Sequence, residues 1–205
     1  MLNLVNKFSI EEALKFGWST TKLNFSFLVK IILIVAVAYL VSGLIRNGLK
    51  DIPVLSFLTA ILFWVFHIVL DIGLIKIALK FNGSQKPDFE DLYNHYPLFW
   101  QYLAGSLLSG LIVLGGFILL IIPGIYFSVK LQFVQYLIVD RGLGPMEAIQ
   151  KSWKMTEGSF WNLLILDIIL GAINVLGALA LLIGLLWTIP TSSIATAFVY
   201  RKLAH

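Results

Sequence analysis

The sequence predicts an all-α membrane protein with six transmembrane helices, arranged as three repeats of an interfacial amphipathic helix and a helical hairpin. Composition is the first reason: 59% of the 205 residues are hydrophobic, 13% are charged, and the mean hydropathy is +0.91. A soluble domain of this size could not bury so much apolar surface. The second reason is a residue pattern that recurs ahead of long apolar runs.

This pattern is clearest in residues 12–25 and 147–160, which read EALKFGWSTTKLNF and EAIQKSWKMTEGSF. When aligned, the two segments share Glu, Ala, Trp, Thr and Phe at equivalent positions, and an apolar run follows each. A looser copy begins at Glu90 (EDLYNHYPLF), with Tyr96 in the place of the tryptophan. We therefore expect one membrane domain over residues 1–205, with repeat units at about 9–80, 88–140 and 145–203.

The first unit is predicted to begin with an amphipathic helix over residues 9–22. Ser9 and Glu12 have the spacing of a capping box, and apolar residues recur on one helical face. Residues 24–45 follow as an almost unbroken apolar run, long enough to cross a hydrocarbon core of about 30 Å. A polar turn that ends at Pro53 then separates this span from a second one.

In the second unit, residues 81–96 are polar, and a short amphipathic segment begins at Asp88. Residues 98–139 are about twice as long as one span needs to be, and Pro123-Gly124 is their strongest breaker. We therefore predict a third and a fourth span that meet in a tight turn at Pro123-Gly124.

The third unit is predicted to begin with a helix. Pro145 is suited to the first turn of this helix, and Gly158 is suited to its end. Residues 160–200 again have the length of two spans, with a turn among residues 181–190 that Pro190 would mark. A glycine precedes each of the three predicted turns, namely Gly43, Gly110 and Gly171. Small residues of this kind favour close helix packing, either within one chain or at the face of a homodimer.

Basic residues are distributed unequally between the two sides of this six-span arrangement. One side holds only Arg46 and Lys50. The other side holds Lys7, Lys15, Lys22, Lys80, Lys86, Arg141, Lys151, Lys154, Arg201 and Lys202. Cytoplasmic segments carry the excess of Lys and Arg, so we expect a multi-pass protein of the cell inner membrane with both termini in the cytoplasm.

Three ionisable side chains inside the predicted spans form a candidate polar cluster: Asp71, Lys130 and Asp167. Each lies about 14 Å, by helical rise, from the predicted cytoplasmic end of its span. Ionisable groups at membrane depth are costly and usually face a protein interior or water. Either the cluster holds the repeats together, or it serves transport of an ion or a small solute.

No residue pattern indicates an enzyme. The chain has no cysteine, which excludes disulfides, thiolate metal sites and thiol catalysis. Nucleophile elbow, paired-His and phosphate-loop motifs are missing from the sequence. Asp91 and His95 are one helical turn apart, but no third ligand lies within sequence reach. We therefore expect no catalytic residue, no metal and no cofactor.

The expected partners are membrane lipids with anionic headgroups on the cytoplasmic side, and possible partners also include a membrane protein. The net charge is +4, and the basic residues flank apolar spans, where anionic lipid headgroups lie, so nucleic acid is not expected as a partner. The interfacial residues predicted to contact lipid or a partner are Trp18, Tyr96, Trp153, Lys15, Lys22, Lys151 and Lys154. The leading hypothesis is a non-enzymatic scaffold or accessory protein, and the alternative is a small transporter or channel that uses the Asp/Lys cluster.

The run PGIYFSVKLQFVQYLIVDRGLGPMEAIQKSWKMTEGSF, followed by TIPTSSIATAFVYRKL, resembles a known group over residues 123–203. It is similar to uncharacterised prokaryotic integral membrane proteins related to the membrane domain attached to some glycerophosphodiester phosphodiesterases. The resemblance rests on the spacing of Pro-Gly, Asp-Arg, Glu-Ala and Ser-Trp pairs. It implies a six-helix membrane fold without an established activity. The phosphodiesterase domain is not part of this sequence, so its chemistry does not carry over.

Overall fold

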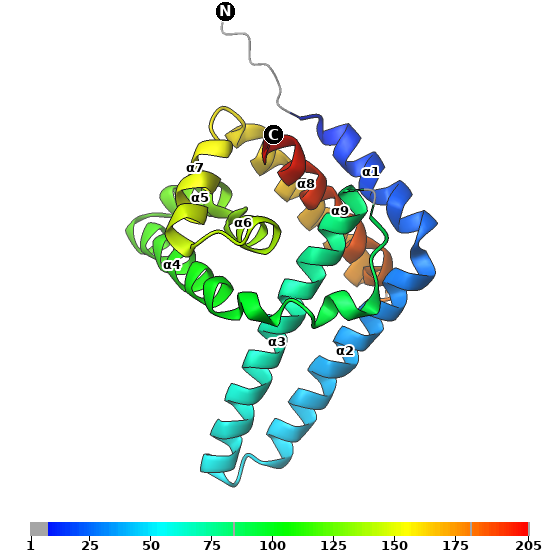
Figure 1. The fold of residues 1–205 in the computed structure, drawn as a ribbon, viewed down its shortest axis with the longest axis vertical. Coiled ribbons are helices and arrows are strands. Elements are labelled where there is room, and N and C mark those ends of the chain that lie inside the picture. The colour runs from blue at the N-terminus through cyan, green and yellow to red at the C-terminus, as the bar shows by residue number, and fades with distance from the viewer. Residues whose placement is uncertain (1–7, 84, 181, 205) are drawn as a thin grey trace, which may run out of the picture.

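The computed structural model describes residues 8–83, 85–180 and 182–204, and within them the chain is helical without a strand (Figure 1). Lys7 and Leu181, which entered the predictions of orientation and of the last turn, lie outside the described residues. The helices, with η for 3₁₀, are α1 (Ile10–Leu23), α2 (Phe25–Gly48), α3 (Pro53–Asn82), η1 (Phe89–Leu92), η2 (Tyr96–Leu98), α4 (Phe99–Leu119), α5 (Ile121–Leu131), α6 (Val134–Arg141), α7 (Pro145–Met155), α8 (Phe160–Leu179) and α9 (Leu185–Ala204).

Five helical stretches in the described part of the chain are long and apolar enough to cross a membrane. They are Phe25–Gly48, Pro53–Asn82, Phe89–Leu119, Ile121–Arg141 and Phe160–Leu179. Helix α9 is as long as α8 but less apolar, because serine and threonine recur along it and Arg201 and Lys202 lie in its last turn. The fold is therefore that of a multi-pass helical membrane protein.

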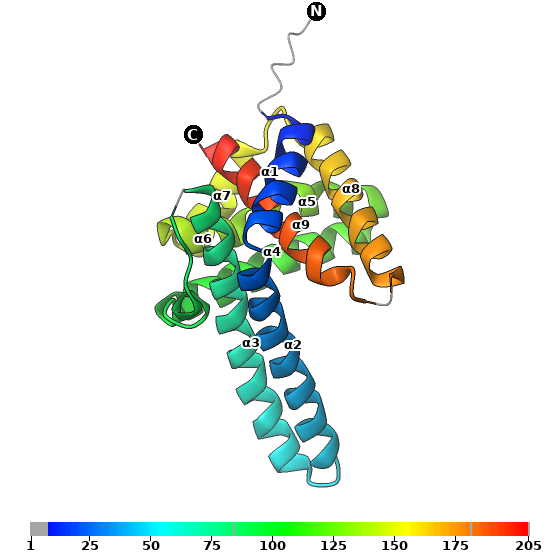
Figure 2. The same ribbon diagram turned by 90° about the vertical axis from the view of Figure 1, so that its right-hand side faces the viewer.

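Helix α1 begins where the sequence predicts, because the Ser9 side chain accepts a hydrogen bond from the backbone N–H of Glu12. Its small residues Ala13, Gly17 and Thr21 recur every four positions, and all three are buried. This stripe packs against α9, and a β-carbon on Gly17 would lie only 2.5 Å from the carbonyl oxygen of Thr191. Small side chains thus hold the first and the last described helices together (Figure 2).

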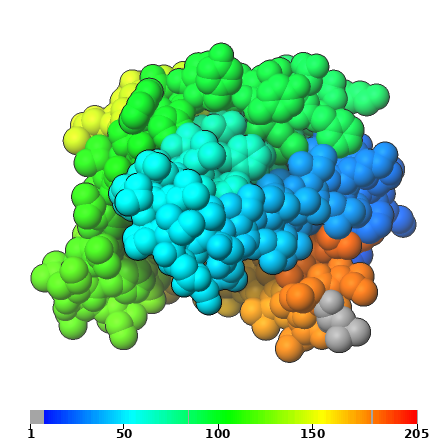
Figure 3. Space-filling model, turned by 90° about the horizontal axis from the view of Figure 1, so that it is seen from below, coloured from blue at the N-terminus to red at the C-terminus, as the bar shows by residue number. Residues whose placement is uncertain are grey.

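Helices α2 and α3 form a hairpin whose closed end projects beyond the rest of the molecule (Figures 1 and 2). Pro53 opens α3 at its first position, where its missing N–H costs no helical hydrogen bond. Viewed onto this end, the hairpin lies between the α4–α5 connection on one side and the end of the α8–α9 pair on the other (Figure 3). The upper part of the hairpin is packed through buried residues that include Ile31, Leu70 and Ile77.

The segment after α3 contains two short 3₁₀-helices in place of the predicted amphipathic helix from Asp88. The Asp91 carboxylate accepts hydrogen bonds from the backbone N–H of Asp88 and from Lys80 of α3, which ties the segment back along that helix. Gly73 permits this, because a β-carbon there would overlap the backbone of Leu92. Tertiary contacts therefore override the local helical pattern.

The break between α4 and α5 falls at Leu120, whose backbone is extended, and not at the predicted Pro123-Gly124. Pro123 lies in the first turn of α5, where backbone N–H groups have no intrahelical partner. Gly116 and Gly124 let the two helices meet closely after the turn.

Helix α7 begins at Pro145 as predicted, and Gly158 follows it with a φ of +75°, a left-handed conformation that glycine adopts without strain. Pro190, by contrast, lies inside α9 and does not mark the turn before it. The glycines ahead of the predicted turns, Gly43, Gly110 and Gly171, have no described atom within 4 Å of a built β-carbon. Close packing depends on other glycines.

Candidate functional site

The predicted polar cluster begins with Lys130, which lies at the end of α5 and is only 4% exposed. Its ammonium group lies 5.7 Å from the ring centroid of Tyr126 and 5.6 Å from that of Trp153. The hydroxyl of Ser152 donates a 2.8 Å hydrogen bond to the carbonyl oxygen of Lys130. Lys130 therefore joins α5 to α7 through a cation–π contact and a backbone contact.

Asp71 lies on α3 and Asp167 on α8, and both are half-buried. Asp71 is within electrostatic reach of His67, Tyr39 and Tyr102, and Asp167 is within reach of Tyr136. Ion pairs among the described residues include Lys15–Glu11, Lys80–Asp91, Arg141–Asp140 and Arg201–Asp140. A shared layer of Asp71, Lys130 and Asp167 stays a prediction.

The predicted interfacial residues of α1 are all on its surface. Trp18 is 53% exposed and packs on Trp187 of α9 with a centroid separation of 5.0 Å. Lys22 is exposed, as is Lys15, whose ammonium group lies 2.6 Å from the Glu11 carboxylate. The hydrogen bond and charge of Lys15 hold the pKa of Glu11 below its usual value, and Glu11 raises the pKa of Lys15. Such a surface pair contributes little to stability.

The other predicted contact residues differ in their surroundings. Tyr96, in η2, is exposed, and so is Lys154 on α7, whereas Lys151 is half-buried. Trp153 packs on Phe127, with ring centroids 5.9 Å apart, as well as on Lys130. Its ring is thus held within the α5–α7 contact, which leaves Trp18 and Tyr96 as the more exposed aromatic groups.

A groove of about 840 Å³ lies between α1, α8 and α9. Glu12, Lys15 and Ser19 give it a polar side, whereas Leu14, Ile173 and Phe198 give it an apolar side. Trp18 lies at the same groove. Thr188 also lines it, and its hydroxyl oxygen is buried without a hydrogen-bond partner among the described residues. That hydroxyl faces Gly177 of α8, so the groove itself combines a long apolar wall with the cation of Lys15 and the carboxylate of Glu12.

The sequence did not reveal this groove. Leu14, Lys15 and Trp18 were visible as part of an amphipathic helix, but Ile173 and Phe198 come from distant segments. The one usable signal was the spacing of Ala13, Gly17 and Thr21, which permits close contact with another helix and so forms one edge of the groove.

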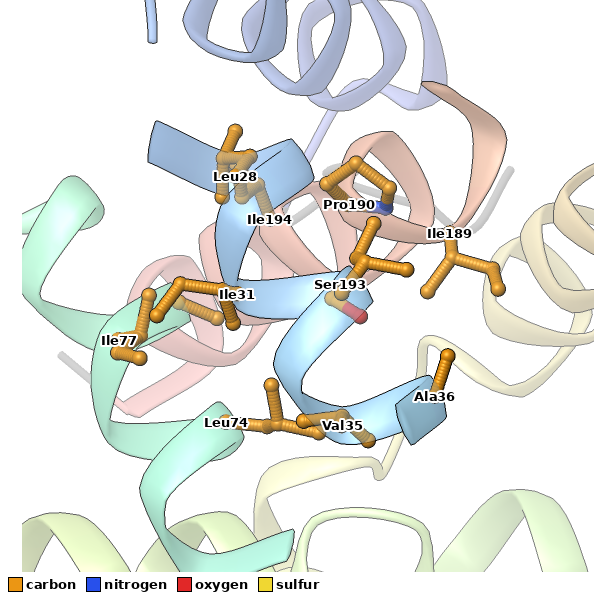
Figure 4. Close-up of a pocket in the computed structure, with 12 residues that line it drawn as sticks. Leu28, Ile31, Val35, Ala36, Leu74, Ile77, Ile189, Pro190, Ser193 and Ile194 are labelled. Atoms are coloured by element: carbon orange, nitrogen blue, oxygen red, sulfur yellow. The ribbon is translucent and has the colours of Figure 1, made fainter. Parts of the chain in front are cut away.

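A second pocket, of about 260 Å³, lies on the opposite side of α9, between α9, α2 and α3 (Figure 4). Leu28, Ile31 and Val35 of α2 face Ile194 of α9 across it. Ser193 is the one polar side chain among its lining residues. This pocket offers no charge to a ligand, so it could take only an apolar group.

No group of three His, Asp or Glu side chains in the described part of the chain is placed to hold a metal ion. The Asp91 carboxylate contacts Lys80 Nζ at 2.5 and 2.7 Å, and His95 Nδ1 lies 3.4 Å from the Asp91 carbonyl oxygen. Asp91 therefore ties the segment to α3 through Lys80, and His95 contacts the backbone of the same segment.

The fold is that of a polytopic helical membrane protein, with an amphipathic groove between α1, α8 and α9. Residues 98–202 match the family described as a domain of unknown function (DUF7847), which is just over half of the chain. The chain belongs to this family. No match links it to the membrane domain of glycerophosphodiester phosphodiesterases, so that part of the resemblance stays a prediction.

Two curated relatives are the uncharacterized proteins Mb2590 of Mycobacterium bovis and MT2637 of Mycobacterium tuberculosis. Each is 26% identical over 152 residues, which cover 74% of this chain and 46% of the relative. The chain therefore spans about half the length of the curated relatives it matches. No solved structure matches it significantly.

Proposed function

We propose that this protein is a non-enzymatic accessory protein of the inner membrane that binds an anionic phospholipid in the groove between α1, α8 and α9. The observation that carries the proposal is the pairing of Lys15 with a long apolar wall in one groove. A phospholipid has the same two parts, a phosphate and acyl chains, joined by ester oxygens that accept hydrogen bonds.

Each part of the lipid has a suitable contact. Leu14, Ile173 and Phe198 offer apolar surface to an acyl chain. Lys15 could exchange its exposed contact with Glu11 for the lipid phosphate at little cost, and the aromatic ring of Trp18 suits the headgroup level.

The membrane arrangement that we propose has α9 as a sixth span and three units of interfacial segment plus hairpin. Both termini then lie in the cytoplasm, and the groove opens to the cytoplasmic leaflet, where anionic lipids attract Lys and Arg. The concentration of basic residues in the segments between hairpins supports this orientation, with Arg46 and Lys50 alone at the α2–α3 turn. A membrane-protein partner could share the same surface.

Native mass spectrometry of the full chain in mild detergent tests the proposal. Purified protein is mixed with equal amounts of phosphatidylglycerol and phosphatidylcholine, and the lipid retained per chain is counted. We expect a preference for phosphatidylglycerol that falls several-fold in the double variant Lys15→Gln, Lys22→Gln. The variant Ile173→Trp, which fills the groove, should lose both lipids.

The matched control is the double variant Arg46→Gln, Lys50→Gln. It also removes two positive charges, but at the closed end of the α2–α3 hairpin, away from the groove. It should retain lipid as the wild type does. Equal retention of the two lipids by wild type, or equal losses in the two double variants, would contradict a site at the groove.

A further inference from the structure

A basic pocket of about 540 Å³ lies at the end of α9, beside the groove that we propose binds lipid. Its described lining residues are Asn82, Gly83, Gln85, Phe198, Arg201 and Lys202. The first three come from the end of α3 and the residues after it, and the others come from the last two turns of α9, which packs beside that end (Figure 1). The described lining thus offers two cations and no carboxylate.

The first of these cations, Arg201, is held in place by Asp140. The Asp140 carboxylate contacts Nη2 of Arg201 at 2.9 Å and Nη1 at 3.1 Å, and it accepts a 2.8 Å hydrogen bond from the Tyr200 hydroxyl. Both terminal nitrogens of the guanidinium group are thus occupied, whereas Nε is buried without an acceptor among the described residues. Arg201 is therefore a positioned cation with one N–H group still to be satisfied.

The second cation, Lys202, is exposed, and its ammonium group lies 5.4 Å from the ring centroid of Phe198. Glu12 lines a hollow next to it at the start of α1, but Lys202 forms no ion pair within the part of the chain that the structure describes. An anion can therefore bind Lys202 without first breaking an ion pair.

Phe198 lines both this pocket and the lipid groove. Its ring stacks on Phe16 of α1 with a centroid separation of 5.0 Å, and Lys15, the residue before Phe16, lines the groove. Thr191 of the groove, Phe198 and Lys202 are spaced by seven and four residues, which places them on one face of α9. The groove and the pocket therefore follow one another along α9, with Lys15 at the groove and Lys202 at the pocket.

We propose that the lipid of the groove carries two phosphate groups, as cardiolipin does, and that Arg201 and Lys202 bind the second phosphate. This inference rests on the proposed lipid site and adds the headgroup that the site selects. Basic pockets on the cytoplasmic side of membrane helices suit headgroups of this kind. Once the first phosphate is bound at Lys15, the second is held at a high local concentration beside the pocket, so the two contacts reinforce each other.

The charges that line the groove and the pocket favour two phosphates over one. The groove has one cation, Lys15, and one carboxylate, Glu12, among its described lining residues. At the pocket, the pairing of Arg201 with Asp140 leaves the charge of Lys202 in excess. A lipid with a single phosphate in the groove would leave this excess charge without a partner, whereas a second phosphate neutralises it.

Native mass spectrometry of the full chain with equal amounts of cardiolipin, phosphatidylglycerol and phosphatidylcholine tests the second phosphate. We expect the wild type to retain one cardiolipin per chain, several-fold more often than phosphatidylglycerol. Lys202→Gln removes an exposed side chain, so the packing of α9 stays intact, and it should lower the ratio of cardiolipin to phosphatidylglycerol several-fold. Lys50→Gln, the matched control at the α2–α3 turn, should keep the wild-type ratio.

The outcomes separate the second phosphate from the lipid site itself. Equal retention of cardiolipin and phosphatidylglycerol, both above phosphatidylcholine, would keep the lipid site and overturn the second phosphate. Two phosphatidylglycerol molecules per chain without a preference for cardiolipin would overturn it as well, because the groove and the pocket would then hold separate lipids. An equal ratio in Lys202→Gln and Lys50→Gln would remove Lys202 from the site. Equal retention of all three lipids would contradict the lipid site and the second phosphate together.

Discussion

The ammonium group of Lys130 lies 5.6 Å from the ring centroid of Trp153, so two residues that the sequence assigned to different sites are in contact. The charge of Lys130 is buried, and the aromatic face of Trp153 supplies part of the electrostatic stabilisation that water would otherwise give. Trp153 therefore packs within the α5–α7 contact, and its predicted contact with lipid or a partner stays a prediction. The contact places the charge of Lys130 against an aromatic face at the end of α5.

We expect a double-mutant cycle of Lys130→Met and Trp153→Leu to show an interaction free energy of about 0.5–2 kcal/mol. The free energy of unfolding of the wild type, both single variants and the double variant is measured in detergent with a chemical denaturant. Lys154→Met, on the exposed face of α7, combined with Trp153→Leu is the control cycle and should show additivity. Additive effects of the first pair would contradict a direct contact.

The second prediction concerns Gly17, which faces the carbonyl oxygen of Thr191 and the side chain of Ala195. Gly17→Ala places a methyl group where there is no room for it, and we expect it to destabilise the protein by about 1–3 kcal/mol. The thermal unfolding midpoint, followed by circular dichroism, measures the effect. Gly43→Ala is the matched control, since Gly43 is also within a helix but has open space around it. Equal midpoints for the two variants would exclude tight packing of α1 on α9.

The third prediction compares a buried ion pair with an exposed one. Lys80 Nζ contacts both carboxylate oxygens of Asp91, which is nearly buried, so Asp91→Asn should destabilise the protein by up to about 3 kcal/mol. Glu11→Gln breaks the exposed pair with Lys15 and should leave the unfolding midpoint unchanged. If Asp91→Asn unfolds at the wild-type temperature, the pair does not hold η1 to α3.

The fourth prediction tests the orientation of the chain in the membrane. The chain has no cysteine, so an introduced cysteine is the only one that can react. Single variants Lys50→Cys and Lys202→Cys are expressed in intact bacterial cells and treated with a membrane-impermeant maleimide. We expect Lys50→Cys to react in intact cells and Lys202→Cys to react only after permeabilisation, because the proposed orientation places the α2–α3 turn on the side opposite the C-terminal end of α9. The reverse pattern would contradict the proposed orientation and place the C-terminal end outside the cytoplasm.

Local signals predicted local structure well. Ser9 and Pro145 start helices where their side-chain chemistry requires, and apolar runs long enough to cross a membrane became helices. Prolines were the less reliable signal, since Pro123 and Pro190 lie in helices and not in turns. A proline in the first turn costs no hydrogen bond, so its position relative to a break is uncertain by several residues.

Contacts between distant segments could not be predicted from periodicity. The approach of Leu92 to Gly73 replaces a helix by two 3₁₀-turns, although the local pattern is amphipathic. The neighbours of Tyr136 come from α4, α8 and α9. The spacing of residues in α6 does not indicate which faces of these three helices will pack against it. The sequence therefore indicated which residue types could form a site, but it did not indicate which distant residues they would contact.

The hydroxyls of Thr21 and Thr191, separated by 170 positions, share a buried hydrogen bond of 3.2 Å. During synthesis, α1 emerges from the ribosome first among the described helices, yet its packing surface is on α9, the last of them. Its buried stripe can therefore pack on α9 only after the intervening helices have been synthesised. A chain cut short before α9 would leave that stripe without its packing partner.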